Sequence, residues 1–342
     1  MKARRIEPHI TINGVELTED AAACLTGISY TDPASGESDS AEVTFSDRER
    51  KWLTDWFPKK TDKMRIQVIL QKWNGDEDEN KRLDCGSFLI DSFSFSGDPV
   101  EVKLSGVSSP VDGNFKAKKR TKTWEKVTVE EIGKDIAGRA GLLFTYDAET
   151  VTISKTEQNE TDDASFLQAL VDEYNLSLKV YSDRLIIFDR ETYKKKDPVH
   201  EFTREEIESW DWQTDIQGSY TGAHMSYTKP KSSKKIEYKT GTDERVLEVS
   251  GDADTEAEAE RKCKAALAKA NHDITKMTIH TKGRADIFAG NTVTVNYTVA
   301  DPKIDTEKSS PISGKYYVDS VAHAITGGYK TTFTLAKIKE ET

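Results

Sequence analysis

Alternation of hydrophobic and polar residues dominates the first 110 residues and predicts β-strands. Apolar residues alternate on both sides of Asn13-Gly14, a pair that favours a two-residue hairpin turn, within the segment Ile10–Leu17. The same period of two recurs over residues 64–70 and 89–95. We therefore expect residues 1–110 to form an antiparallel β-barrel module.

One short helix is predicted inside this module. Ser46 follows the strand at residues 41–45, and Glu49 stands three positions later, which is the spacing of a capping box. The next residues carry Trp52 on the expected inner face, and Pro58 marks a point where a helix cannot continue. This pattern predicts a short helix that ends before Pro58.

The period of the apolar residues changes to that of a helix in the next segment, residues 111–198. Two helices are expected there, at residues 128–141 and 161–175, each with a capping residue at its start. The first has a Thr at its N-cap and Glu131 at the third helical position. Short strands and a hairpin complete the segment, so the sequence predicts a small α+β domain at residues 111–198.

The rest of the chain is predicted to be a second β-barrel module with an insertion. Alternation typical of strands covers residues 199–228 and 276–342. Residues 229–275 contain a polar loop and a helix that begins at a capping box formed by Thr255 and Glu258. The inner face of this helix carries small apolar side chains, which permits close packing against a sheet. We expect this segment to be inserted in the second module.

A short motif occurs once in each predicted β module. Gly86 is followed by Asp91-Ser92, and Gly314 by Asp319-Ser320, with an aromatic–aliphatic stretch between the glycine and the acid. Alternating strands flank both copies, which indicates a duplicated supersecondary unit. The predicted fold class is therefore mainly β with α+β insertions. It comprises two similar antiparallel β-barrel modules, a small α+β domain and a helical excursion.

Composition narrows the class of protein. A chain of 342 residues suits two or three domains, and its 6 Trp, 12 Tyr and 12 Phe are too many for a disordered protein. The net charge of −11 disfavours binding to nucleic acid. No apolar run approaches the ~20 residues of a membrane helix, so we expect no membrane insertion. Three distant cysteines indicate neither a disulfide framework nor a metal site.

The sequence offers little catalytic chemistry. The six histidines are dispersed without metal-ligand spacing, and motifs for a nucleophilic serine, a phosphate loop or a dinucleotide are absent. Asp91 and Asp319 stand out because they occupy the same position in both copies, and we favour a structural role for them over catalysis. We predict no enzyme activity and no catalytic, cofactor-binding or metal-binding residues.

Three longer stretches, at residues 85–97, 108–124 and 314–329, resemble the phage late-control D family. Proteins of this family are baseplate hub proteins of contractile tails in phages, defective prophages and tailocins. The segment Ala285–Gly290 and the helix at residues 255–271 add to the likeness, which covers nearly the whole chain. The resemblance implies a virion structural protein of the tail baseplate.

The resemblance also implies partners. Three chains with two similar barrels each would form a homotrimeric, pseudo-sixfold ring that adapts the hexameric tail tube to the trimeric spike. Because the chain ends at Thr342, soon after the second copy of the motif, we expect the spike to be a separate protein. Other expected partners are baseplate proteins, with the tape-measure protein or DNA only in transit through the lumen. Subunits would be made in the host cytoplasm and assembled into the particle without a cofactor.

Two other functions stay open. A tail-associated cell-wall hydrolase would need a pair of acids in an open cleft or a zinc cluster. A carbohydrate-binding adhesin would use aromatic side chains in exposed loops, whereas Trp52, Trp56, Trp210 and Trp212 occur in patterns typical of packing.

Overall fold

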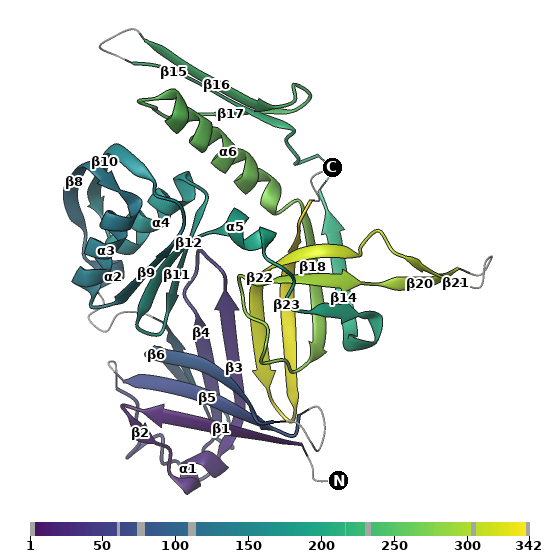
Figure 1. Ribbon diagram of the computed structural model, residues 1–342. Helices are drawn as coiled ribbons and strands as arrows, with labels where there is room; N and C mark the ends of the chain where they lie inside the picture. The colour runs from purple at the N-terminus through teal and green to yellow at the C-terminus, as the bar shows by residue number, and fades with distance from the viewer. Residues whose placement is uncertain are drawn as a thin grey trace.

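The structure, a computed structural model, describes residues 4–59, 62–73, 79–108, 114–215, 217–229, 234–301 and 306–339. Most of these residues form antiparallel strands, with helices inserted between them (Figure 1). The predicted class, mainly β with α+β insertions, is confirmed. No helix in these ranges is both long and apolar enough to cross a membrane.

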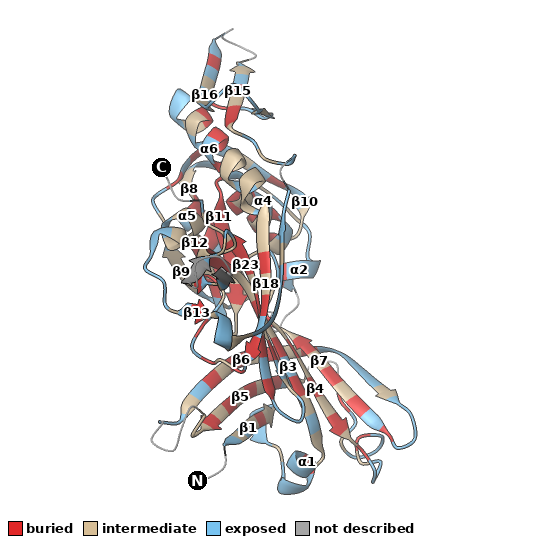
Figure 2. Cartoon of the chain, turned by 90° about the vertical axis from the view of Figure 1, so that its right-hand side faces the viewer, coloured by how far each residue is buried: buried red, intermediate tan, exposed pale blue. Residues whose placement is uncertain are grey.

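The first β unit is an antiparallel array of five strands with two more strands at one edge. Alternate residues are buried, as Figure 2 shows, because successive side chains of a strand point to opposite faces. Val43, Ile66 and Leu104 are among the fully buried residues of its core. In spatial order its strands are β3 (Leu25–Pro33), β4 (Ser40–Ser46), β7 (Glu101–Val107), β6 (Lys81–Ser96), β5 (Lys63–Gln71), β1 (Arg5–Ile12) and β2 (Val15–Glu16).

The second β unit is built in the same way from later residues. Ile279, Val293 and Phe333 are among the fully buried residues of its core. One strand, β13, pairs with β19 in parallel, unlike the other pairs of the unit. In spatial order its strands are β14 (Ile207–Thr214), β18 (Thr275–Lys282), β23 (Tyr329–Lys337), β22 (Gly314–Ile325), β19 (Thr292–Asn296) and β13 (Glu201–Thr203).

A single ladder joins the two units into one 13-stranded sheet. The first half of β22 pairs with β19, and its second half, Ser320–Ile325, pairs antiparallel with Ile28–Pro33 of β3. The sequence predicted two similar β-barrel modules, without a pairing between them. The structure joins them because β22, at 12 residues, is long enough to pair with both strands along one edge.

A small α+β domain packs beside the first unit (Figure 1). Ile132, Leu167 and Ile187 are fully buried in its own core. The predicted capping box is present, since the N–H of Glu131 donates to Thr128 Oγ1 at 3.1 Å. Its elements are α2 (Asn114–Ala117), β8 (Arg120–Thr128), α3 (Val129–Ala140), β9 (Leu143–Asp147), β10 (Thr152–Thr161), α4 (Asp163–Glu173), β11 (Leu176–Tyr181), β12 (Arg184–Asp189) and α5 (Arg190–Lys195).

A three-stranded sheet covered by α6 projects from the second unit (Figure 1, top). The predicted insertion at residues 229–275 begins too late, because β15 pairs with β16 and β17 and not with the main sheet. The reason is packing: Met225 of β15 is buried with Cys263 on the small-sided face of α6. The other predicted boundaries remain predictions. The elements are β15 (Gly222–Thr228), β16 (Lys235–Gly241), β17 (Val246–Val249) and α6 (Glu256–His272).

The predicted helix before Pro58 is not formed, and the chain makes turns there. Ser46 is the last residue of β4, and its N–H donates to the carbonyl of Cys24 at 2.8 Å, so it belongs to the sheet. Asp47 instead accepts the N–H of Trp52 at 3.0 Å and stabilises the turn. The remaining elements are α1 (Glu19–Ala23), the 3₁₀ turn η1 (Arg204–Glu206), β20 (Thr298–Asp301) and β21 (Thr306–Ser309).

A buried ion cluster connects the α+β domain to both β units. Lys179 on β11 donates to the carboxylates of Asp32 and Asp39 and, at 2.8 Å, to the carbonyl of Pro33. The other carboxylate oxygen of Asp32 accepts the N–H of Ala289, in the loop before β19, at 2.9 Å. One cation and its two carboxylates therefore connect three parts of the chain.

The two carboxylates share one cation, and burial changes the pKa of Asp39. Loss of solvation raises the pKa of Asp39 to about 6, although Lys179 and the hydroxyl of Tyr30 both stabilise the charged form. Burial also opposes the charge of Lys179, but Asp32 and Asp39 outweigh it and raise the pKa of the lysine. The ion pairs of Lys179 with the two aspartates therefore hold the cluster together.

Lys179→Met is expected to lower the free energy of unfolding by about 3–5 kcal/mol near neutral pH, because two buried carboxylates lose their cation. The loss should shrink as the pH falls toward about 6, because without Lys179 the folded variant binds a proton on Asp39 at a higher pH than the natural protein, in which the pKa of Asp39 is about 6. Urea unfolding at about pH 5 and about pH 7.5 measures both effects.

Lys103→Met is the matched control, since this exposed lysine lies near Glu42 and Glu101 on the same sheet. It should cost at most about 1 kcal/mol. Equal losses in the two variants would contradict a structural role for the Lys179 cluster.

Candidate assembly interfaces

The two β units have the same strand order and the same register. Ile66 of β5 lies opposite Gly86 of β6, and Val295 of β19 lies opposite Gly314 of β22. The five strands β3–β4–β7–β6–β5 thus correspond in order to β14–β18–β23–β22–β19.

The aspartates of the predicted motif lie at matching points of the two units. Asp91 is the extra residue of a bulge opposite β7, and Asp319 is the extra residue of a bulge opposite β23. In each case the ladder resumes at the serine of the motif, Ser92 or Ser320. A bulge re-aims the strand and leaves one residue unpaired. A structural role for the motif remains our proposal, and the shared bulge supports it.

The glycines of the motif also have matching backbone conformations. Gly86 has φ = 93° and Gly314 has φ = 140°, values that favour glycine because other residues clash there. A Cβ added at Gly86 would also lie 3.2 Å from the ring of Tyr181 in the α+β domain. Backbone conformation therefore favours glycine at this position of both copies.

The correspondence extends to the outermost strands, β3 and β14. β3 has a bulge between Leu25 and Gly27 opposite β4, and β14 has one between Ile207 and Ser209 opposite β18. After these bulges, Gly27 of β3 corresponds to Ser209 of β14, and the residues that follow correspond one to one. β14 is therefore the counterpart of β3, although only β3 has a second neighbour in the described chain.

The internal junction between β22 and β3 is buried and aromatic. His323 lies opposite Tyr30, and the two rings stack with centroids 5.5 Å apart. His323 Nδ1 lies 2.8 Å from the hydroxyl of Tyr329, which itself donates to the carbonyl of Arg284. The neutral imidazole therefore carries its proton on Nδ1. Burial lowers the pKa of His323 to about 4.

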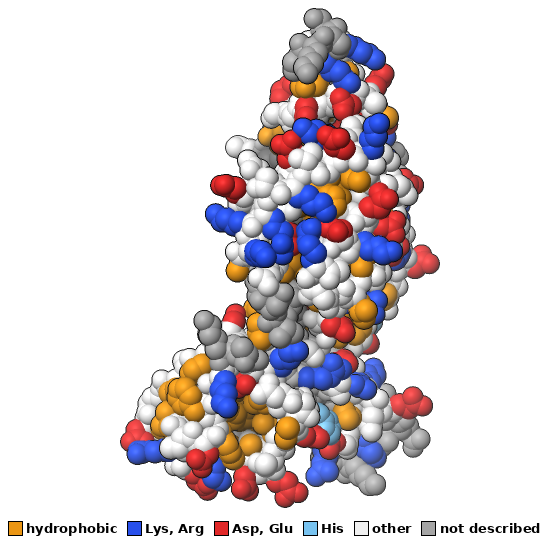
Figure 3. Space-filling view, turned by 90° about the vertical axis from the view of Figure 1, so that its left-hand side faces the viewer, with side chains coloured by type: hydrophobic (Ala, Val, Ile, Leu, Met, Phe, Trp, Pro, Cys, Tyr) orange, Lys and Arg blue, Asp and Glu red, His pale blue; other side chains and the backbone are white. Residues whose placement is uncertain are grey.

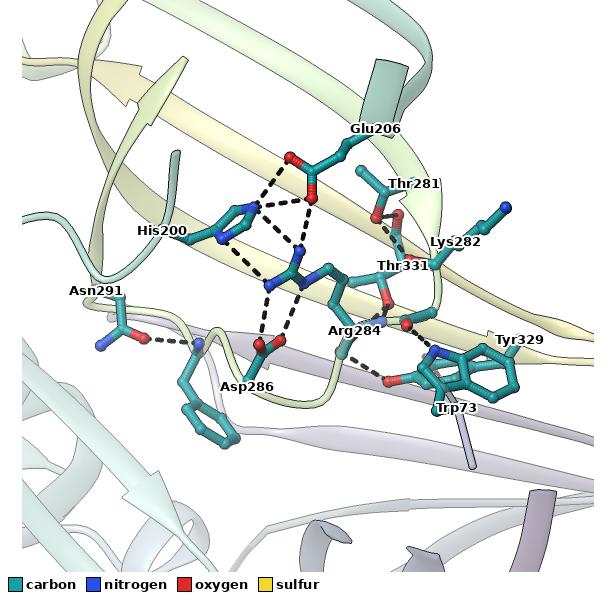
Figure 4. Close-up of polar contacts among 12 residues, drawn as sticks. Trp73, His200, Glu206, Thr281, Lys282, Arg284, Asp286, Asn291, Tyr329 and Thr331 are labelled. Carbon is teal, nitrogen blue, oxygen red and sulfur yellow. Dashed lines mark hydrogen bonds and ion pairs between the residues drawn. The ribbon is translucent and has the colours of Figure 1, made fainter. Parts of the chain in front are cut away.

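The loop after β18 braces this junction (Figure 4). The indole N–H of Trp73, from the first unit, donates to the carbonyl of Gly283 at 2.6 Å. The next residue, Arg284, donates to Asp286 and to Glu206, each at 2.9 Å. The contacts of Arg284 fix the loop to the second unit, and the carbonyl of Gly283 binds Trp73 of the first unit.

The edges that correspond to the internal junction are unpaired. β14 pairs only with β18, and residues 92–96 of β6 pair only with β7, among the described residues. Phe93 is 37% exposed while its counterpart Val321 is fully buried, and Trp210 is 43% exposed while its counterpart Ile28 is 4% exposed. Hydrophobic side chains gather on the lower part of Figure 3, where the first unit lies. These two edges are therefore candidate interfaces.

The described residues offer little for catalysis or metal binding. A hollow of about 710 Å³ between the first unit and the α+β domain has Asp183 as the single acidic residue of its lining. Ligand atoms of His272, Asp273 and Asp319 lie within 4.8 Å of one another. However, His272 Nε2 contacts Asp319 at 2.7 Å and Asp273 pairs with Lys276 at 2.9 Å. This group fits ion pairing beside the motif better than a metal site.

Sequence reasoning did not single out Lys179, Arg284 or His323. Their roles depend on contacts between residues far apart in the chain, which a linear pattern does not reveal. For His323 the duplication was an available signal. It stands four positions after the aspartate of the second motif, where the first copy has Phe95.

The contribution of His323 to stability should fall as the pH drops from about 6.5 to about 4, because the unfolded chain protonates His323 before the folded chain does. This difference in pKa corresponds to about 3 kcal/mol. His323→Phe should remove that dependence, so that the variant gains stability relative to the natural protein in this range. Urea unfolding across the range measures the gain, with His280→Gln, a change of an exposed histidine on β18, as control. Parallel pH profiles for natural protein and His323→Phe would contradict the assignment.

Solved structures of phage tail proteins have the same fold. The tail protein from Neisseria meningitidis MC58 matches with a TM-score of 0.70 and 14% identity over 97% of this chain and 96% of that one. The 43 kDa tail protein of prophage MuSo2 from Shewanella oneidensis matches with a TM-score of 0.69 and 10% identity over 97% and 98%. The E. coli c3393 protein, a component of the type VI secretion system, matches with a TM-score of 0.58 and 11% identity over 97% and 77%.

No protein-family model matches the sequence, and no curated protein matches it. Membership of the late-control D family therefore remains a prediction. The three structural matches cover nearly all of this chain, so the likeness concerns the whole arrangement of sheet, domain and insertion. The chain has the fold of phage tail proteins, as its resemblance to baseplate hubs implied.

Proposed function

We propose that this protein is a structural, non-enzymatic baseplate hub subunit of a phage or phage-like particle. Three copies form a pseudo-sixfold ring that adapts the hexameric tail tube to the trimeric spike. The observation that carries the proposal is the duplicated five-stranded unit. It leaves one chain with two unpaired edges, on β14 and on β6, that correspond to the two strands of the internal junction.

The geometry of these edges favours a ring. They are different surfaces of one chain, so a contact between copies is head-to-tail, and such contacts close into rings when the rotation permits. Two similar units per chain supply six units in a trimer, which suits a sixfold tube on one side. The α+β domain occurs once per chain and so repeats threefold, which suits a threefold spike. The spike, tube and other baseplate proteins are the partners of this proposal.

The alternative functions have less support. A cell-wall hydrolase needs two carboxylates at a defined separation in a cleft. The hollow beside the α+β domain has one acidic residue in its described lining. Other hollows have several, but Glu191 and Glu260 in one are paired with lysines, and Glu206 and Asp286 in another are paired with Arg284.

For an adhesin, the exposed aromatic residues are divided between strands, with Phe93 and Trp210, and loops, with Phe57, Tyr220 and Phe288. Phe57 packs on Phe93 and Phe95.

Light scattering after size-exclusion chromatography should give a particle with three times the 38.4 kDa mass of one chain, alone or with the candidate spike. Phe93→Lys should shift this particle to monomer, since a lysine on an edge strand opposes pairing. Its fold should persist, because Phe93 is partly exposed in the single chain.

Val15→Lys is the matched control, because Val15 is 70% exposed on a different strand, β2, and should leave the trimer intact. A natural protein that remains monomeric at high concentration and with the spike would overturn the proposal.

A further inference from the structure

We propose that neighbouring copies join by antiparallel pairing of residues 92–96, at the end of β6, with residues 211–215 of the next copy, at the end of β14 and directly after it. The register is the one that β22 and β3 use inside the chain. This inference rests on the proposed ring and specifies the contacts that would close it.

The register follows from the internal duplication. Inside the chain, Ser320–Ile325 pairs with Ile28–Pro33. The first unit's counterpart of 320–325 is 92–97, because the motif bulges align there. The second unit's counterpart of 28–33 is 210–215, because the bulges of β3 and β14 align. Both edges are free among the described residues, so the same ladder can form between copies up to Ser96, since Gly97 begins the turn after β6.

The facing side chains suit this pairing. The internal junction stacks His323 on Tyr30, and the transferred register sets Phe95 opposite Trp212 of the next copy. Phe95 already stacks on Phe57 at 5.7 Å and packs on the first unit's core. Trp212 packs on the core of the second unit. An aromatic pair would therefore join two cores between copies, as it does inside the chain.

The free end of β6 lacks the residues that usually prevent an exposed strand from pairing. Proteins protect exposed edges with charged residues, especially Lys, or with Pro. Residues 92–96 of β6 read Ser-Phe-Ser-Phe-Ser, with neither charge nor proline. Their counterparts on β22, which do pair, also have small outward residues, at Ser320, Ala322 and Ala324. An uncharged edge with small outward side chains fits a strand that becomes internal on assembly.

Cysteine pairs can test the register. The N–H of Ala34 donates to the carbonyl of Asp319 at 2.7 Å, so every second pair along this ladder is hydrogen-bonded. Thr31 and Ala322 are then a non-hydrogen-bonded pair, and their counterparts are Gln213 and Ser94. Cα atoms of such pairs lie about 4.5 Å apart, inside the range that a disulfide spans.

The experiment uses the full chain with Ser94→Cys and Gln213→Cys, in a Cys24→Ser background because Cys24 is the half-buried native thiol. Mild oxidation should give covalent trimers on a non-reducing gel, whereas either cysteine alone can give no species larger than a dimer. The internal pair Thr31→Cys with Ala322→Cys should oxidise within one chain and stay monomeric on the gel. It serves as the positive control for the geometry.

The register control is Ser94→Cys with Asp211→Cys, which lies two residues off on the same face. Diagonal residues are about 7–8 Å apart, so this pair should cross-link at least about fivefold less. Equal or stronger cross-linking of the control pair would overturn the proposed register. Trimers in light scattering with no cross-link from either pair would overturn the edge pairing and leave the proposed ring intact. Monomers by both methods would overturn both.

Discussion

The ladder between β22 and β3 is the contact on which the rest of this structure depends. Backbone N–H and C=O groups must find partners, and an exposed strand edge is a row of groups without them. The two units satisfy that requirement for each other along Ser320–Ile325 and Ile28–Pro33. Both units have the same strand order, and the ladder pairs one edge of each. The corresponding edges, on β6 and β14, stay unpaired among the described residues of the single chain.

Side chains reinforce the internal junction by several different interactions. Stacking of His323 on Tyr30 fills the space between the cores, and the Trp73 indole fixes a loop of the second unit to the first. Lys179 adds charge from a third part of the chain. None of the partners of Lys179 is repeated at the free edges, since its cluster belongs to the α+β domain, to β3 and to the loop between β3 and β4. In the proposed ring, the same backbone register would therefore be supported by different side chains inside one chain and between copies.

Local patterns predicted much of the fold, and contacts across the chain account for what they missed. The capping box at Thr128 and the N-cap hydrogen bond at Thr255 depend on neighbouring residues, so spacing alone located both helices. Ser46 carried the same local signal, but β4 needed its backbone for the sheet. Among the candidate site residues, Asp91 and Asp319 could be singled out because repetition is visible in one dimension. The ion cluster of Lys179 was not predictable, since Asp32 and Asp39 are about 140 positions earlier in the sequence.

Covalent connection of the two units has a consequence for how a ring would assemble. A contact between tethered partners forms at the high effective concentration set by the tether, whereas the same contact between separate molecules depends on their bulk concentration. In the proposed hexad of units, three seams would be permanent and three would respond to dilution. Fusing a duplicated unit into one polypeptide therefore halves the number of seams that must form between separate molecules, from six to three. It also confines every reversible step to the seams between β6 and β14.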